Sequence, residues 1–186
     1  MKYYIIAGEA SGDLYGSNLV RELKLKDSKA DIRAWGGDLM QEQGVDLVKH
    51  YKDHNYMGFL EVIRNLGTIL KNITFCKQDI KAFSPDALIL IDFPGFNMRI
   101  AKYFYKYSFP VLYYIAPQVW AWNENRVESI KKYVDKLYVI LPFEKKFLKK
   151  HGVESKYMGH PLLEHILNFK NKESVSKSKF KIKHGL

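Results

Sequence analysis

The chain has 186 residues, of which 47% are apolar or aromatic and 27% are charged, with a formal net charge of +10. This length and composition support one domain with a substantial core, and they exclude disorder along the whole chain. The single cysteine excludes an internal disulfide and a zinc site built from cysteines, and it favours a reducing, cytoplasmic location.

Strands and helices are expected to alternate along the chain, from the periodicity of its apolar residues. In chain order, the expected strands are Lys2–Ala7, Asp31–Trp35, Ala87–Ile91, Val111–Ile115, Leu137–Leu141 and Lys156–Met158. The expected helices are one with Leu14, Leu19, Val20 and Leu23 on one face, and others over 59–83, 96–107, 123–133 and 143–150. This alternation predicts a Rossmann-like α/β fold, in which a parallel sheet carries helices on both faces.

The last part of the chain differs from the rest. Residues 168–186 are rich in lysine and serine and contain little core material, so we expect a domain over 1–167 followed by a basic linker over 168–186. More widely, residues 1–98 hold 12 lysines and arginines against 13 acidic residues, whereas residues 99–186 hold 18 against 7. Such a basic half attracts nucleic acid, anionic membranes or phosphorylated substrates.

The motifs and segments that the sequence lacks bear on two of these partners, nucleic acid and membranes. No helix-turn-helix, zinc or RNP-like motif accompanies the basic residues, so we expect no nucleic-acid partner. No apolar run approaches the ~20 residues that span a bilayer, and the short apolar run at the N-terminus is not typical of a signal peptide. The protein is therefore expected to be soluble or to lie on a membrane surface.

The first candidate site follows the first expected strand, because ligands of open α/β sheets bind beyond the carboxyl ends of the strands. It is the glycine-bearing turn Gly8-Glu9-Ala10-Ser11-Gly12-Asp13. Glycines let the backbone approach a ligand, and the next helix offers free N–H groups to a phosphate or a sugar hydroxyl. The spacing matches neither G-x-G-x-x-G nor a Walker loop. The alternative is a tight turn in which Ser11 or Asp13 caps the helix.

The second candidate site follows the most hydrophobic strand, Ala87–Ile91. Asp92 leaves this strand at the ligand-binding edge, and partial burial would raise its pKa, as a general base requires. The alternative is that Asp92 caps the following helix or binds loop amides. Asn97, one helical turn further on, is expected either to cap or to touch the ligand.

The third candidate site is the segment 116–122, which follows strand Val111–Ile115. Its glutamine, Gln118, and its two tryptophans suit a platform for a sugar or a base, and the alternative is a packed loop. Near the end of the domain, a lone His160 is more typical of a structural than of a catalytic residue.

An amphipathic helix is also predicted in the middle of the chain. Its apolar residues recur at helical spacing, with Arg64 and Lys71 at the edges of the stripe. A helix facing the core explains this pattern, and a helix facing a membrane would have the same one.

Taken together, these segments resemble the N-terminal part of the lipid-A-disaccharide synthases, glycosyltransferase family 19. The motifs that carry the resemblance are AGEASGD at 7–13, MGFLEV at 57–62, FPGFN at 93–97, APQVWAW at 116–122, LPFEK at 141–145 and MGHP at 158–161. The resemblance implies a GT-B fold and an inverting glycosyl transfer without a cofactor or a tightly bound metal. The implied substrates are UDP-2,3-diacylglucosamine and 2,3-diacylglucosamine 1-phosphate, which would be joined by a β-1,6 bond at the inner membrane of Gram-negative cells.

The resemblance also implies roles for particular residues. It makes Asp92 the catalytic base that deprotonates the acceptor hydroxyl. The residues implied in substrate binding are Gly8, Glu9, Ser11, Gly12, Asp13, Asn97 and Gln118. The residues implied in contacts with the membrane or with acyl chains are Met57, Phe59, Leu60, Val62, Ile63, Leu66, Ile69 and Leu70.

One departure from that family concerns the donor. Its members continue into a C-terminal domain that holds most of the UDP-sugar site, and no such domain follows in this sequence. We therefore expect an N-terminal fragment that is inactive alone, with the donor half supplied by a missing domain or a second chain. The alternative is a stand-alone Rossmann-type module that binds a nucleotide or a lipid without catalysis.

Overall fold

The computed structural model describes residues 1–54, 66–122, 126–163 and 166–167. Its strands are β1 (Lys2–Ala7), β2 (Asp31–Gly36), β3 (Asp46–His50), β4 (Ala87–Ile91), β5 (Val111–Tyr114), β6 (Lys136–Val139) and β7 (Lys156–Tyr157). Its helices are α1 (Ala10–Lys26), α2 (Asp38–Glu42), the 3-10 helix η1 (Tyr51–His54), α4 (Leu66–Phe83), α5 (Pro94–Phe104), α6 (Val119–Trp122), α7 (Arg126–Tyr133) and α8 (Pro142–Lys150).

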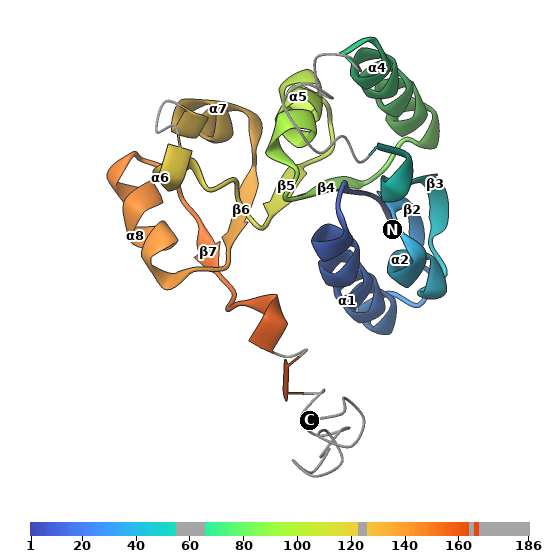
Figure 1. Cartoon of the computed structure of the whole chain (residues 1–186), viewed down its shortest axis with the longest axis horizontal. Helices are drawn as coiled ribbons and strands as arrows, with labels where there is room; N and C mark the ends of the chain where they lie inside the picture. The colour runs from blue at the N-terminus through green and yellow to red at the C-terminus, as the bar shows by residue number, and fades with distance from the viewer. Residues whose placement is uncertain (55–65, 123–125, 164–165, 168–186) are drawn as a thin grey trace, which may run out of the picture.

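All strand pairs are parallel, and the strands lie in the order β3-β2-β1-β4-β5-β6-β7. The chain therefore runs outward from β1 to β3, returns through α4 to the other side of β1, and then runs outward again from β4 to β7 (Figure 1). Strands β1 and β4, which are far apart in the sequence, pair directly in the centre of the sheet.

Hydrophobic clusters on both faces of the sheet form the core. Alternate residues of a strand point to opposite faces, so Tyr4 joins a cluster with residues of α4, α5 and α7, while Ile5 joins one with residues of α1 and α2. Every side chain of β4 is buried. This arrangement confirms the predicted Rossmann-like sheet with helices on both faces, and it explains why the central strands read as unbroken aliphatic runs.

The predicted elements agree best with the structure in the centre of the sheet. Strands β1 and β4 have the predicted bounds, whereas β3 and the short helix α2 were not predicted. The side chains of β3 are only half-buried or exposed at the edge of the sheet, so this strand lacks a strong apolar signal. The helix expected over 59–83 is observed from Leu66 as α4, and its first part lies outside the described residues.

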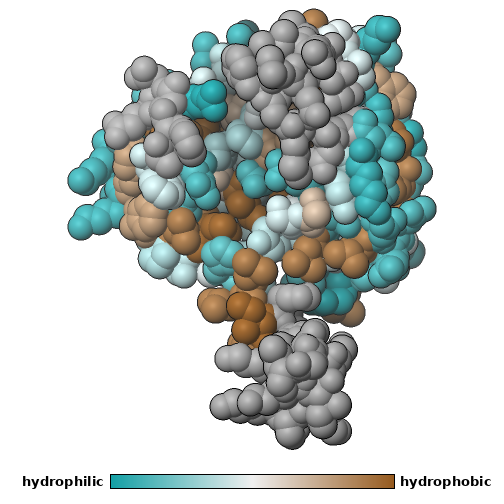
Figure 2. Space-filling view, viewed as in Figure 1, coloured by the Kyte–Doolittle hydropathy of each residue, from teal (hydrophilic) through white to brown (hydrophobic). Residues whose placement is uncertain are grey.

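The surface near the end of the domain is apolar. Exposed apolar side chains follow the start of β7, and they are visible along the lower edge of the molecule (Figure 2). They are Tyr157, Met158, Leu162, Leu163, Ile166 and Leu167. The linker expected over 168–186 lies outside the described residues. Within the described ranges, no helix is both long enough and apolar enough to cross a membrane.

Candidate active site

The candidate site lies where the direction of the chain reverses in the sheet. Strands β1 and β4 are neighbours, but the chain leaves them toward opposite edges of the sheet, which opens a crevice at their carboxyl ends. Gly8 follows β1 and Asp92 follows β4, so two of the three predicted segments meet at this point.

Asp92 and Phe93 have left-handed backbones, with φ angles of 45° and 50°. This conformation costs a residue other than glycine about 1–3 kcal/mol, so the surroundings must hold it. The carbonyl oxygen of Asp92 accepts hydrogen bonds from Asn97 Nδ2 at 2.8 Å and from the Tyr113 hydroxyl at 2.7 Å. These two bonds fix the turn that presents the Asp92 carboxylate.

The Asp92 carboxylate is half-buried. Burial, and after it the negative charge of Glu9, raises the pKa of Asp92 above its ordinary value. Burial and the charge of Asp92 together raise the pKa of Tyr15 as well. An aspartate with a raised pKa at a cleft is a stronger base than a solvated one, as proton abstraction requires.

Asn97 is fully buried and does not cap α5, whose N-cap residue is Phe93, so the expected capping role is wrong, whereas a contact with the ligand remains a prediction. Besides the bond to Asp92, its Nδ2 lies 3.2 Å from the carbonyl oxygen of Ile91 and 3.4 Å from that of Ile6. Its side chain therefore joins the ends of β1 and β4 instead of capping α5. Among the described residues, no hydrogen-bond donor reaches its Oδ1. We assign Asn97 to positioning Asp92.

Asp13 is also buried, at 2% exposure, and the structure gives it a structural role. Its Oδ1 accepts the backbone N–H groups of Gly37 at 2.8 Å and Met40 at 3.0 Å, and its Oδ2 accepts that of Leu39 at 3.1 Å. The carboxylate therefore caps α2, not α1. This corrects both the expected contact of Asp13 with substrate and its alternative role as cap of the following helix.

The glycine turn after β1 is shorter than predicted, because α1 already begins at Ala10. Glu9 is the N-cap residue without a side-chain cap bond, and Glu9 and Ser11 are exposed, whereas Gly12 is buried in the first turn. A Cβ atom on Gly8 would overlap the Phe93 ring. Glycine at position 8 is therefore needed so that the ends of β1 and β4 can approach each other. Contacts of Gly8, Glu9, Ser11 and Gly12 with substrate remain predictions.

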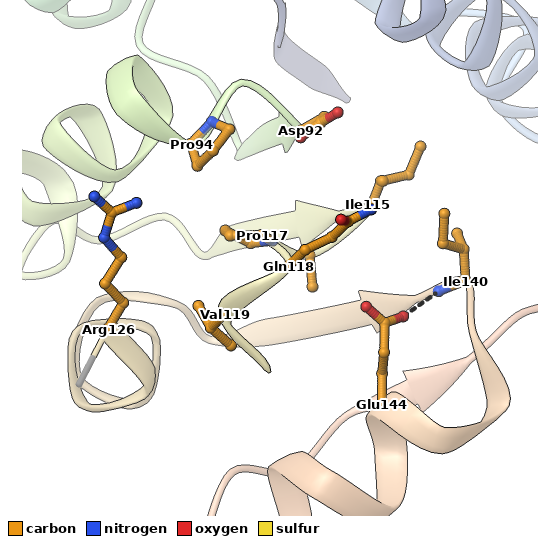
Figure 3. A pocket seen from close by; sticks show the side chains of 10 residues that line it. Asp92, Pro94, Ile115, Pro117, Gln118, Val119, Arg126, Ile140 and Glu144 are labelled. Carbon is orange, nitrogen blue, oxygen red and sulfur yellow. Dashed lines mark hydrogen bonds between the residues drawn. The ribbon is translucent and has the colours of Figure 1, made fainter. Parts of the chain in front are cut away.

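A pocket of about 290 Å³ lies beside Asp92 (Figure 3). Asp92 and the exposed Gln118 both line this pocket, so the predicted segment 116–122 does reach the site. Ile115, which follows β5 and also lines the pocket, has a left-handed φ of 64°, an unusual conformation for a β-branched residue. Binding of substrate by Gln118 remains a prediction.

Two further charged residues of this pocket, Arg126 and Glu144, were not identified from the sequence. Glu144 is buried and accepts backbone N–H groups from Ile140 and Leu141 at 3.2 and 2.9 Å, and the Trp120 Nε1 at 3.2 Å. Trp120 is half-buried in the short helix α6, and its role as a platform for a sugar remains a prediction. The LPFEK motif was the only sequence signal for Glu144, and nothing local marked Arg126.

The predicted membrane helix is only partly described. Ile69 is partly buried and packs against the core, whereas Leu70 is 54% exposed, and membrane contacts of both remain predictions. Of Leu66 only the backbone position is described. The remaining residues of that prediction, Met57, Phe59, Leu60, Val62 and Ile63, lie outside the described residues.

A metal centre is not evident in the described part of the chain. Within residues 1–54, 66–122, 126–163 and 166–167, no group of three or more histidine, cysteine, aspartate or glutamate residues is arranged to hold an ion. Independence of metals and cofactors remains a prediction.

Solved structures define the class of this fold. The chain resembles the UDP-GlcNAc 2-epimerase from Neisseria meningitidis bound to UDP-GlcNAc with a TM-score of 0.67 and 10% identity, covering 100% of this chain and 53% of that one. It resembles the UDP-N-acetylglucosamine 2-epimerase from Rickettsia bellii with a TM-score of 0.64 and 15% identity, covering 98% and 51%. At such low identity these likenesses establish the fold alone, a Rossmann-like domain of the GT-B type.

Sequence comparison establishes the family. The model of the lipid-A-disaccharide synthetase family matches residues 3–185, and the chain belongs to that family. It is 44% identical over 162 residues to the lipid-A-disaccharide synthase of Geobacter metallireducens, covering 87% of this chain and 42% of the relative. The synthase of Coxiella burnetii is 39% identical over 158 residues, covering 85% and 42%. The chain thus spans less than half the length of these relatives.

Proposed function

We propose that this chain is the acceptor-binding, base-bearing half of a glycosyltransferase of lipid A biosynthesis. The complete enzyme would transfer 2,3-diacylglucosamine from UDP-2,3-diacylglucosamine to 2,3-diacylglucosamine 1-phosphate. The observation that carries the proposal is the position of Asp92, a carboxylate with a raised pKa, held in a strained turn where β1 and β4 meet.

In the proposed mechanism, Asp92 accepts the proton of the acceptor 6-hydroxyl. The oxygen then attacks the anomeric carbon of the donor sugar from the face opposite UDP, the bond from that carbon to the UDP oxygen breaks, and UDP leaves with the bonding electrons. The attack inverts the anomeric carbon and forms the β-1,6 bond. Asn97 and Tyr113 hold Asp92 through its carbonyl oxygen, so the base keeps its direction during the reaction.

The test of the base is Asp92→Asn in a complete enzyme, made by joining this chain to the C-terminal part of the Geobacter metallireducens relative. Because general-base catalysis contributes about 10²–10⁴-fold, we expect turnover to fall by at least ~100-fold with folding intact. The matched control is Asp31→Asn, an exposed aspartate at the opposite end of the sheet's strands. Turnover of Asp92→Asn near that of the control would contradict the assignment of the base.

We propose that the UDP-sugar site lies in a second domain or a second chain. This is supported by relatives that are more than twice as long as the matched segment, and by the apolar side chains exposed after the start of β7. Calorimetric titration of the chain in mild detergent should detect the acceptor lipid and not UDP. Tight UDP binding without lipid binding would favour the alternative, a stand-alone nucleotide-binding module.

We further propose that the protein works on the cytoplasmic face of the inner membrane without spanning it. The excess of basic residues over 99–186, 18 against 7 acidic ones, favours an anionic lipid surface, and Leu70 and Phe75 are exposed on α4. Sedimentation with vesicles should show binding that increases with anionic lipid and decreases with salt. Equal binding to neutral vesicles would contradict the electrostatic part of this proposal.

A further inference from the structure

A second cavity, of about 250 Å³, adjoins the pocket beside Asp92. The two cavities share four lining residues, Pro94, Pro117, Val119 and Arg126. The second one extends from these residues over the first turns of α5 and the start of α7. The two cavities are therefore immediate neighbours, close enough for one ligand to have a group in each.

The two cavities differ in charge. The pocket beside Asp92 is lined by two carboxylates, Asp92 and Glu144, together with Arg126. The second cavity is lined by two arginines, Arg99 of α5 and Arg126 of α7, and none of its described lining residues is an aspartate or a glutamate. Among the residues whose positions the structure describes, no carboxylate pairs with either arginine. The second cavity is thus positively charged, and both guanidinium groups can take an anion.

The geometry around the arginines suits a phosphate group in particular. Figure 3 shows the Arg126 side chain extending from α7 toward α5. Ser129 also lines the cavity, one helical turn after Arg126 and on the same face. A Cβ atom on Gly95, in the first turn of α5, would meet no atom within 4 Å, so the positive end of this helix is open to the cavity. An arginine guanidinium group can donate two parallel hydrogen bonds to the oxygens of one phosphate.

We infer that the second cavity binds the phosphate of the acceptor sugar phosphate, with Arg99 and Arg126 as its ligands. This inference rests on the proposed function. In the acceptor, the 1-phosphate and the CH₂ group that carries the reacting 6-hydroxyl are attached at the two ring carbons that flank the ring oxygen. They therefore need two neighbouring subsites, one with a base for the hydroxyl and one with positive charge for the phosphate. The carboxylate-lined pocket would receive the hydroxyl, and the arginine-lined cavity the phosphate. Arg126, which lines both, would fix the distance between them.

The test is calorimetric titration of the chain in mild detergent with 2,3-diacylglucosamine 1-phosphate, with 2,3-diacylglucosamine and with UDP. We expect the first lipid to bind more tightly than its dephosphorylated form. Arg99→Gln and Arg126→Gln should each weaken binding of the phosphorylated lipid about 10- to 100-fold, as expected for the loss of a charge-assisted hydrogen bond, and leave the other lipid unaffected. Arg126→Lys should restore part of the affinity.

The control variant is Lys132→Gln on α7, which removes the same charge from an exposed residue outside the cavity. Both arginines are exposed, so circular dichroism should show unchanged folding in every variant. Equal affinity of the chain for the two lipids, or wild-type affinity in both arginine variants, would overturn the inference while the proposed function stands. A chain that binds neither lipid would overturn both. If the arginine variants lost UDP binding and kept the lipid, the cavity would belong to the donor diphosphate, and the inference would be wrong.

Discussion

The segments that follow β1 and β4 each contain an aspartate, Asp13 in the first turn of α1 and Asp92 directly after β4, and the two carboxylates have opposite surroundings. After β1, Asp13 is buried with both oxygens engaged by three backbone N–H groups. After β4, Asp92 is half-buried, its pKa is raised, and the hydrogen bonds around it go to its carbonyl oxygen. One carboxylate thus has all its hydrogen bonds within the fold, whereas the other keeps a raised pKa beside a pocket, as the proposed base requires.

The largest effect on stability should follow from removing the Asp13 carboxylate, whose two oxygens both accept hydrogen bonds. Asp13→Ala would leave three backbone N–H groups at the start of α2 without their acceptor, and we expect it to lower the free energy of unfolding by about 3 kcal/mol. Urea denaturation measures this. Asp38→Ala, in the same helix, should cost far less because Asp38 lies at the surface in an exposed pair with Lys52. Similar losses in the two variants would argue against the structural role of Asp13.

The next largest effect concerns the contact between the two strand ends. Gly8→Ala would press a methyl group into the Phe93 ring, so we expect a loss of about 2 kcal/mol and a lower turnover, because Phe93 adjoins Asp92. Gly67→Ala, where a Cβ meets no atom within 4 Å, should instead raise stability by about 0.5–1 kcal/mol. Thermal unfolding of both variants measures this difference in stability. A Gly8→Ala protein as stable as the wild type would mean that close approach of the ends of β1 and β4 does not require glycine at position 8.

The hydrogen bonds that hold the turn at Asp92 can be tested with two smaller changes. Tyr113→Phe removes one of the two hydrogen bonds to the Asp92 carbonyl oxygen and should cost about 1 kcal/mol. Asn97→Ala removes the other. Because both side chains serve the same oxygen, the double variant should deviate from the sum of the single ones by at least ~0.5 kcal/mol. Strict additivity in urea denaturation would show that the two residues act independently.

The smallest effect is a gain of stability at the reactive carboxylate. Because the pKa of Asp92 is raised on folding, its contribution to stability is present below the pKa of the unfolded chain and is lost as the pH rises through the folded pKa. Asp92→Asn should therefore be more stable than the wild type at neutral pH, and this advantage should disappear in acid. Melting temperatures at the two pH values test it. A variant that is less stable at neutral pH would contradict a raised pKa.

The sequence was sufficient for the central part of this architecture. The aliphatic runs of β1 and β4 predicted both strands and placed Asp92 at the ligand-binding edge, since a strand buried on both faces needs an unbroken apolar pattern. The edge strand β3 has no such pattern and was missed. The roles of Asp13 and Asn97 could not be predicted from neighbouring residues, because their hydrogen-bond partners are distant in the sequence. Asp13 binds the N–H group of Gly37, and Asn97 binds the carbonyl oxygen of Ile6.

The arginine-lined cavity was out of reach of sequence reasoning for a related reason. Arg99 and Arg126 lie on different helices, and they line one cavity only because α5 and α7 pack on the same face of the sheet. Neither residue stands in a recognisable motif. Only the order of the strands brings such side chains together.

The pairing of β1 with β4 has a consequence for how the protein is made. The paired residues, such as Tyr3 and Ala87, are separated by β2, β3 and α4, so this contact closes a long loop of chain and is expected to form slowly. During synthesis β1 can pair with β2 early, but it must wait for β4 to leave the ribosome. In a nascent chain the turn at Asp92 therefore takes its position only when the centre of the sheet closes, and premature termination before β4 yields a product without the proposed base.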